Sequence, residues 1–334
     1  MVNMMMKNKY IIIGITLIAV IGAIIIGFEY FETQKPSNQQ LIVSTTTSFY
    51  ETGFLDVVKK SFEEKYHYIN VSFISQGTDL AIQTAKRGDA DMIMVHDPGQ
   101  ELSFLTGGYG VNRKIIAYNF FVIVGPSNDP AGITGLAPLD ALKKLKSAGD
   151  SGTITWVSRG DGSGTHSKEK NLWKAAGFNA TLLRKLPWYL ERGAGMTDTL
   201  KLADEKDAYT LTDLASYLNN YKNRNIKLKI MVEQSKDLLN VYSVIANNPQ
   251  KINLTGSNFD ATMKFINYVI SDEGQQLFAD FGQSTFGKSL FSPYIPLVTK
   301  RSNATLLQWV QNYAFFNGTE CPQEYRYKAD ELYK

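Results

Sequence analysis

Five consecutive residues with hydroxyl side chains, Ser44-Thr45-Thr46-Thr47-Ser48, follow a short strand-like run and precede a helix-like one. One hydroxyl is enough to cap a helix, so the simplest interpretation is an N-cap with β-branched neighbours. Five hydroxyls beside the free N–H groups of a helix N-terminus also supply the donors that an anion requires. The run therefore predicts one wall of an anion-binding site.

A second donor-rich segment runs from Ser158 to His166 and reads SRGDGSGTH. Its glycines allow sharp turns that bring backbone N–H groups close to a ligand. Ser163 and Thr165 add hydroxyls, and Arg159 adds a planar cation with several donors, which suits an oxyanion. A solvated glycine-rich surface loop is the alternative. An arginine, three glycines and two hydroxyls between a strand and a helix favour the anion site.

Two further loops could extend this site. SQGT at 75–78 would contribute Gly77 and Thr78, and ERGAGMT at 191–197 would contribute Gly195 and Met196. Each loop alone is an ordinary turn. In open α/β sheets, however, ligands bind beyond the carboxyl ends of the strands, so strand-to-helix loops of this kind can converge.

The elements that must position these loops alternate between strands and helices, which predicts an α/β fold. Residues 41–45, 68–75 and 91–96 read as strands, and amphipathic helices at 51–66 and 79–87 separate them. In the first helix, Leu55, Val58 and Phe62 share an apolar face and the charged residues lie opposite.

Two long apolar strands, at 115–126 and 238–249, mark where the chain leaves a first lobe and returns to it. Residues 259–282 read as two helices that pack back on the first lobe. An inserted lobe between two crossing strands predicts a hinge and a ligand cleft. The expected division is 41–120 and 241–298 for lobe 1, 121–240 for lobe 2, and 299–334 for a C-terminal extension without an assigned role.

Residues 1–30 have a different character. Residues 10–28 are uncharged and apolar, and as a helix they would be about 28 Å long, enough to span a bilayer. Lysines precede this run and glutamates follow it, which places the N-terminus in the cytoplasm. We expect an uncleaved membrane anchor, or alternatively a cleaved signal segment, followed by a polar spacer at 31–40. Either way, the folded body lies on the extracytoplasmic side.

The composition argues against several function classes. The 334 residues include 35 Lys and Arg against 32 Asp and Glu, a net charge of +3, so nucleic acid is not an expected partner. One cysteine and three histidines leave little basis for a metal centre, and none is expected. Ser163 and His166 lie close in sequence, but no strained nucleophile turn frames the serine, so an enzyme is not expected.

The motifs STTTS, SQGT, SRGDGSGTH and GAGMTDTL together resemble the tungstate-binding proteins of ABC transporters, over residues 41–295. The resemblance implies a two-lobed type II periplasmic-binding-protein fold that captures tungstate, or molybdate, and delivers it to an ABC permease and its ATPase. It also implies a set of oxyanion ligands: Thr46, Thr47, Ser48, Arg159 and Thr165, with Ser163 alongside.

The choice of oxyanion leaves alternatives open. Tungstate and molybdate are unprotonated dianions at neutral pH and need only donors, whereas hydrogen phosphate carries a proton that an acceptor can recognise. Asp161 could accept that proton, or it could instead pair with Arg159 or cap backbone N–H groups within its own loop. A phosphate- or sulfate-binding protein of the same fold, or a membrane-tethered oxyanion sensor, are the alternative functions. No cofactor is expected besides the bound oxyanion, and the residue types do not separate tungstate from molybdate.

Overall fold

The computed structural model describes residues 38–252 and 259–333, and the chain from Gln40 onward forms one compact unit. The anchor predicted at 10–28 and most of the predicted spacer lie outside the described residues. Within the described ranges, no helix is both long and apolar enough to cross a membrane.

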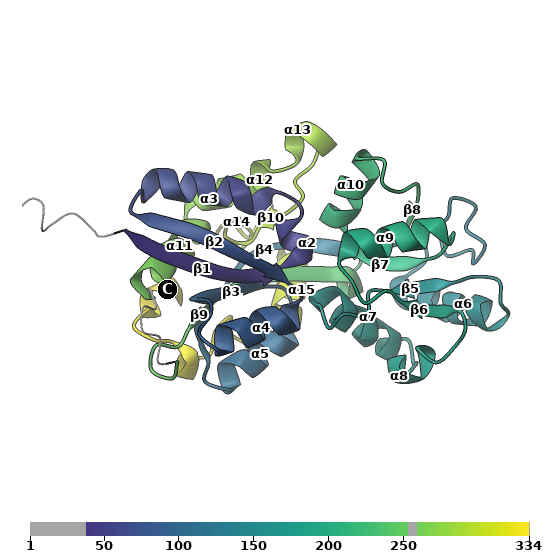
Figure 1. The fold of residues 1–334 in the computed structure, drawn as a ribbon, viewed down its shortest axis with the longest axis horizontal. Coiled ribbons are helices and arrows are strands. Elements are labelled where there is room, and N and C mark those ends of the chain that lie inside the picture. Colours follow the sequence, from purple (N-terminus) through teal and green to yellow (C-terminus); the bar gives the residue numbers. More distant parts are fainter. Residues whose placement is uncertain (1–37, 253–258, 334) are drawn as a thin grey trace, which may run out of the picture. The chain divides into compact units, whose positions relative to one another are not determined.

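Lobe 1 is built on a mixed sheet in the order β10-β4-β9-β3-β1-β2 (Figure 1). Its strands are β1 (Gln39–Thr46), β2 (Ile69–Gln76), β3 (Met92–Val95), β4 (Gly110–Gly125), β9 (Leu239–Asn247) and β10 (Ser292–Pro293). β1 and β3 pair in parallel, so both strands end at the same edge of the sheet. α2 (Thr47–Tyr50) follows β1 there, and α5 (Pro98–Thr106) follows β3.

Helices α3 (Phe54–Lys65), α11 (Phe259–Ile270) and α12 (Asp272–Asp280) pack their apolar faces into the core of lobe 1. Leu55, Val58 and Phe62 are buried there, as their spacing predicts. The helix predicted over 51–66 begins only at Phe54, because Gly53 has a φ of +78° and separates α2 from α3.

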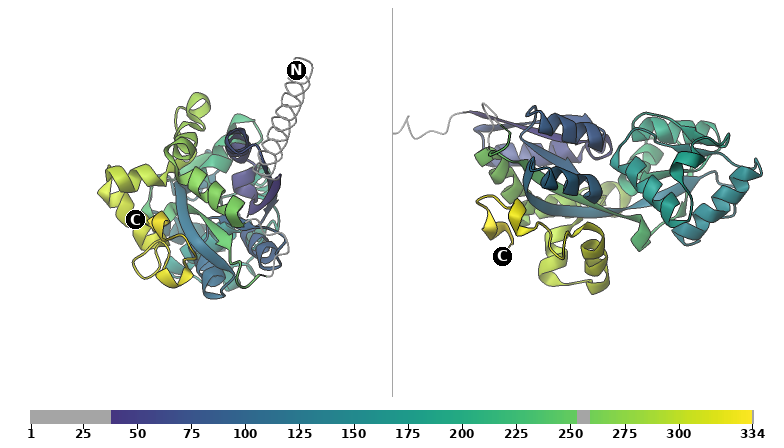
Figure 2. Two further views of the ribbon diagram at one scale, coloured as in Figure 1. Left: turned by 90° about the vertical axis from the view of Figure 1, so that its left-hand side faces the viewer. Right: turned by 90° about the horizontal axis from the view of Figure 1, so that it is seen from below.

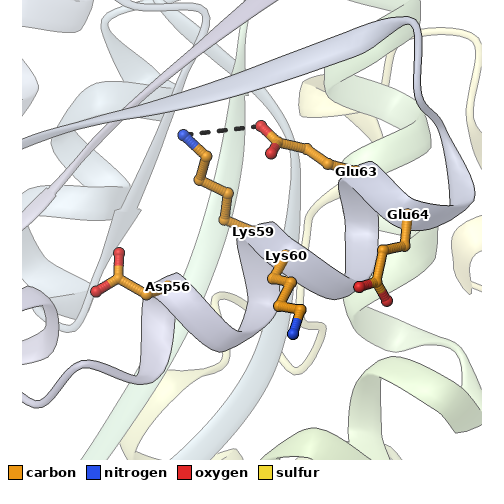
Figure 3. A pocket seen from close by; sticks show the side chains of 5 residues that line it. All are labelled: Asp56, Lys59, Lys60, Glu63 and Glu64. Atoms are coloured by element: carbon orange, nitrogen blue, oxygen red, sulfur yellow. Dashed lines mark ion pairs between the residues drawn. The ribbon is translucent and has the colours of Figure 1, made fainter.

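The outer face of α3 is charged, as its sequence predicts. Asp56, Lys59, Lys60, Glu63 and Glu64 line a surface hollow there, and Lys59 pairs with Glu63 at 3.8 Å (Figure 3). Both signs of charge alternate over a single helix, so this hollow is a solvated surface with no preference for an anion.

Strand β4 runs through both lobes. Its residues 110–120 pair with β9 in lobe 1, and its residues 121–125 pair with β7 (Thr210–Asp213) and β8 (Lys229–Val232) in lobe 2. The strand is longer at its start than the predicted 115–126, and the predicted pair of crossing strands is confirmed as β4 and β9.

Lobe 2 has its own α/β core, as predicted. Its remaining elements are α6 (Pro138–Asp150), β5 (Trp156–Ser158), α7 (Gly164–Ala175), α8 (Ala180–Leu183), β6 (Tyr189–Glu191), α9 (Met196–Glu205), α10 (Leu214–Lys222) and a 3₁₀ turn, Lys236–Leu238. Trp156, Trp173 and Trp188 pack together in this core, and β5 and β6 pair in parallel. β5 and β6 therefore point the loops that follow them in the same direction.

The C-terminal segment packs along β4 and β9 (Figure 2). It contains α14 (Tyr294–Lys300), α15 (Ala304–Ala314) and two 3₁₀ turns, Gln323–Tyr325 and Asp330–Tyr333, whereas α13 (Gln283–Phe286) follows α12 and has no buried residue. Val310 and Ala314 of α15 are buried against Ile115 of β4 and Val241 of β9. The extension to which the sequence assigns no role is thus part of the folded body.

A fully buried ion pair joins β4 to α5 beneath this extension. Arg113 Nε donates to Glu101 Oε2 at 2.8 Å, and both side chains are fully buried. The Arg113 guanidinium also lies 4.5 Å from the ring centre of Phe316 and donates to the carbonyl oxygen of Glu320 at 2.7 Å. The pair therefore ties two elements of lobe 1 to the C-terminal extension.

Candidate functional site

The hydroxyl run divides between the sheet of lobe 1 and the start of α2. Thr45 donates to the carbonyl oxygen of Met94 at 2.9 Å, so its hydroxyl is used within the sheet. Thr46 is the N-cap of α2, and its Oγ1 lies 3.5 Å from Ser48 Oγ. Both of these side chains are buried, and Thr47 is half-buried. Thr46, Thr47 and Ser48 are therefore the members of the run that lie at the start of the helix.

Arg159 connects this run to lobe 2. Its side chain is 1% exposed, and its Nη2 donates to Thr47 Oγ1 at 2.6 Å across the two lobes. Its Nε donates to Asp161 Oδ2 at 2.9 Å, and the other Asp161 oxygen accepts from Ser163 N at 3.1 Å. Asp161 thus both pairs with Arg159 and accepts from a backbone N–H group of its own loop, two of the roles considered for it.

The glycines of the SRGDGSGTH loop have the conformations that this motif requires. Gly160 and Gly162 have φ values of +68° and +73°, where a residue with a Cβ atom is strained. Ser163 is the N-cap of α7, and its hydroxyl accepts from His166 N at 3.3 Å. The loop therefore turns the chain sharply from β5 into the N-terminus of α7.

The SQGT loop meets the first turn of α7. Gly77 is the N-cap of α4 (Thr78–Lys86), and Thr78 Oγ1 accepts from Gly164 N at 2.9 Å. A Cβ atom on Gly164 would lie 2.8 Å from the His96 ring, so glycine permits this close approach of the lobes. Thr165, the next residue, is fully buried, and no protein group in the described ranges hydrogen-bonds its hydroxyl. A buried hydroxyl without a partner is uncommon, and this one is available to a ligand.

The fourth loop also reaches lobe 1. Gly195 is the N-cap of α9, Met196 is fully buried, and Thr197 Oγ1 donates to Glu51 Oε2 at 3.0 Å. Burial raises the pKa of the Glu51 carboxyl above its usual value. The neighbour of this loop in lobe 1 is thus a carboxylate, a contact that the sequence did not reveal, since Glu51 and Thr197 lie far apart in the chain.

His96 is a second residue that sequence reasoning missed, because it reads as part of an ordinary turn. Its side chain is buried at the end of β3, and its Nδ1 lies 2.9 Å from Asn240 Oδ1. The amide oxygen can only accept, so Nδ1 carries the proton and Nε2 is the acceptor, 3.4 Å from Ser48 Oγ. Burial lowers the pKa of His96 to about 4, so the ring is neutral at physiological pH. The signal that could have found it is its place at a strand end, which it shares with the other loops.

Glu169 supports the Arg159 loop from within lobe 2. This buried carboxyl of α7 accepts hydrogen bonds from Trp156 Nε1 at 2.7 Å, Ser158 Oγ at 2.9 Å and the Tyr189 hydroxyl. Burial raises the pKa of Glu169 to about 7, although these hydrogen bonds oppose the shift. The Glu169 carboxyl thus connects β5, β6 and α7. One of its hydrogen-bond donors, Ser158, immediately precedes Arg159 in the chain.

The raised pKa makes stability depend on pH. Because the folded protein binds a proton at Glu169 more tightly than the unfolded chain does, the contribution is fully present below the usual pKa of 4.5 and is lost as pH rises through 7. Between pH 4.5 and 7 the unfolding free energy should therefore fall with rising pH, and Glu169 should account for up to about 1 kcal/mol of this fall per pH unit. We expect Glu169→Gln to remove this part of the slope. Urea unfolding at several pH values measures this slope. Glu205→Gln on the exposed surface of α9 is the control, and an unchanged slope in Glu169→Gln would contradict the assignment.

These contacts bring together the N-termini of α2, α4, α7 and α9, with Arg159 and several hydroxyls between the two lobes. All ten predicted site residues belong to these four loops. Helix N-termini present free N–H groups and a partial positive charge, which favours anions. The arrangement can hold a small oxyanion by neutral donors and one guanidinium.

Comparisons with known proteins agree with this chemistry. The model of one protein family, described as a PBP superfamily domain, matches residues 33–273. The tungstate-binding protein TupA of Peptoclostridium acidaminophilum is 36% identical over 253 residues, which are 76% of this chain and 85% of that protein. The structure of the tungstate-binding protein TupA from Desulfovibrio alaskensis is 36% identical with a TM-score of 0.65, and the match covers 77% of this chain and 99% of that one. The tungstate ABC transporter structure from Geobacter sulfurreducens is 41% identical with a TM-score of 0.65, covering 74% of this chain and all of that one.

Proposed function

Since the chain belongs to the PBP superfamily, we propose that it captures tungstate on the extracytoplasmic side of the membrane and delivers it to an ABC permease and its ATPase. The names of its relatives support this ligand and this transport context. In this proposal the protein binds and releases its ligand unchanged, so it acts as a solute-binding protein and not as an enzyme.

The observation that carries the proposal is the contact between Arg159 Nη2 and Thr47 Oγ1, which joins the two donor-rich motifs across the lobes. A buried guanidinium beside hydroxyls and helix N-termini is the donor set that an unprotonated dianion requires. We propose ligand-binding roles for all of the predicted residues: Thr46, Thr47, Ser48, Gly77, Thr78, Arg159, Ser163, Thr165, Gly195 and Met196. The unpartnered Thr165 hydroxyl supports its inclusion.

The state of Asp161 favours tungstate or molybdate over phosphate. Both of its oxygens already accept hydrogen bonds, one from Arg159 Nε and the other from Ser163 N. A site for hydrogen phosphate needs an acceptor that is free to receive the ligand's proton. The resemblance to tungstate-binding proteins then favours tungstate over molybdate.

The remaining parts of the proposal follow from the sequence. Residues 1–30 anchor the protein in the membrane, and the spacer ends before β1 begins at Gln39, so it is two residues shorter than the predicted 31–40. The lobes divide near residues 120 and 240, and the change of partners along β4 supports the first of these boundaries. The lobes close over the ligand by rotation about β4 and β9.

Calorimetric titration of the full chain in detergent tests the proposal. Tungstate, molybdate, sulfate and phosphate are each titrated alone and then in competition. We expect one tungstate to bind per chain and neither sulfate nor phosphate to displace it. Tight binding of phosphate or sulfate without binding of tungstate would contradict the proposed ligand and favour the alternative of the same fold.

A further inference from the structure

Lys168 of α7 is a buried cation that the proposed site does not use. Its side chain is nine-tenths buried, and its Nζ donates to the carbonyl oxygen of Leu239 at the start of β9, at 2.9 Å. In the described ranges, no carboxylate lies within ion-pair distance of this ammonium group. A buried charge without an ion-pair partner is costly, so other groups must stabilise it.

Aromatic rings take the place of a carboxylate. Lys168 Nζ lies 4.2 Å from the ring centre of Tyr313 and 5.9 Å from that of Phe121. The shorter contact is a desolvated cation–π interaction, which stabilises by up to about 2 kcal/mol. Burial lowers the pKa of Lys168 to about 8, and the negative charges of Asp97 and Asp237 oppose this shift, so the group is mostly charged at neutral pH.

Tyr313 belongs to α15, in the C-terminal extension. The match to the family model ends at residue 273, so this helix lies outside the part of the chain that the family describes. α15 packs on β4 and β9 through the apolar cluster that contains Val310 and Ala314. The Tyr313 ring is therefore held on lobe 1 by the rest of its helix, and it contacts Lys168 from lobe 2.

Lys168 lies three residues after Thr165, which places it about one turn into α7. Because a helix moves as a rigid unit over so short a distance, a contact that fixes Lys168 also fixes the first turn of α7. That turn contains Gly164, whose N–H donates to Thr78 Oγ1 across the lobes, and the unpartnered Thr165 hydroxyl. Tyr313 and Lys168 are thus connected to the anion loop through a single helical turn.

We propose that the C-terminal extension positions the anion-binding loop, with Tyr313 holding Lys168 and thereby the N-terminus of α7 in the closed arrangement of the lobes. The inference rests on the proposed function, because the loop is assigned there to the oxyanion. Tyr313 and Lys168 are positioning residues: they act through α7 and do not touch the ligand. A contact present mainly in the closed arrangement adds to affinity by slowing ligand release.

A double-mutant cycle on tungstate binding tests this inference. We expect Lys168→Met to weaken binding about tenfold, which corresponds to 1.4 kcal/mol, and Tyr313→Leu to weaken it by a similar factor. Tyr313→Phe retains the ring and should bind within about twofold of the parent. The double variant should be no weaker than Lys168→Met alone, because the two side chains act through one contact. Calorimetry gives the dissociation constants. Stopped-flow kinetics should show that the loss of affinity comes from faster dissociation of tungstate.

Trp309→Leu is the structural control, because Trp309 lies on the same helix and packs against the same apolar cluster. It should lower the melting temperature without weakening tungstate binding. If Lys168→Met and Tyr313→Leu both bind tungstate within twofold of a parent that itself binds, or if their effects simply add, the positioning role is wrong. A parent that binds none of the four oxyanions would overturn the proposed function and this inference together.

Discussion

Replacing Arg159 by alanine is expected to reduce the affinity for tungstate about 100-fold or more. Arg159 is the one cation in the four loops that is both buried and in contact with the opposite lobe. Charge-assisted hydrogen bonds in a desolvated site contribute more than neutral ones, and removing one member of a buried charged pair costs about 2–5 kcal/mol. The dissociation constant from calorimetry measures the loss.

Two further variants make this result specific. Arg159→Lys keeps a positive charge but loses the planar group that bridges Thr47 and Asp161, so we expect an intermediate loss. Arg192→Ala removes an equal charge from an exposed residue of lobe 2 that pairs with Asp198 at 3.6 Å. We expect its tungstate affinity to be close to that of the parent. If Arg159→Ala bound tungstate as tightly as Arg192→Ala does, the assigned site would be wrong.

The second large effect concerns stability. Glu101→Gln is expected to lower the free energy of unfolding by about 3 kcal/mol, because it leaves the fully buried Arg113 guanidinium without a counter-charge. Chemical denaturation with urea measures the change. The Phe316 ring and the Glu320 carbonyl oxygen still contact the guanidinium, but neither carries a compensating charge.

Matched variants separate charge from packing. Arg87→Ala breaks the exposed pair with Asp89, whose side chains are 61% and 56% exposed, and should change the unfolding free energy by less than about 1 kcal/mol. The double variant Glu101→Leu with Arg113→Met removes both buried charges and should be more stable than Glu101→Gln. A Glu101→Gln protein as stable as the parent would show that the pair contributes little.

The sequence predicted the parts of the fold that local patterns determine. The spacing of Leu55, Val58 and Phe62 predicts the buried face of α3, and two long apolar runs predict β4 and β9. The boundaries were less accurate, because residues 51–53 form a turn and α3 begins only after Gly53, inside the predicted segment. Periodicity detects which face of an element is buried more reliably than it detects where the element ends.

The candidate site could be predicted as far as its motifs are continuous in the sequence. Arg159 and Thr165 were found because they share one loop with three glycines. His96, Glu51 and the Lys168–Tyr313 contact were not found, because each acquires its role from a partner far away in the chain. Nothing in a single strand-end histidine or a C-terminal tyrosine indicates which helix the fold will place beside it.

The continuity of β4 constrains how the protein can move. One unbroken strand belongs to the sheets of both lobes, with a shift of register between Ile123 and Val124 where β8 joins it. Rotation of one lobe against the other must therefore twist β4, which is hydrogen-bonded to neighbouring strands both before and after this shift of register. Because twisting a hydrogen-bonded strand costs free energy, β4 limits the angle through which the two lobes can rotate. A flexible linker in its place would set no such limit.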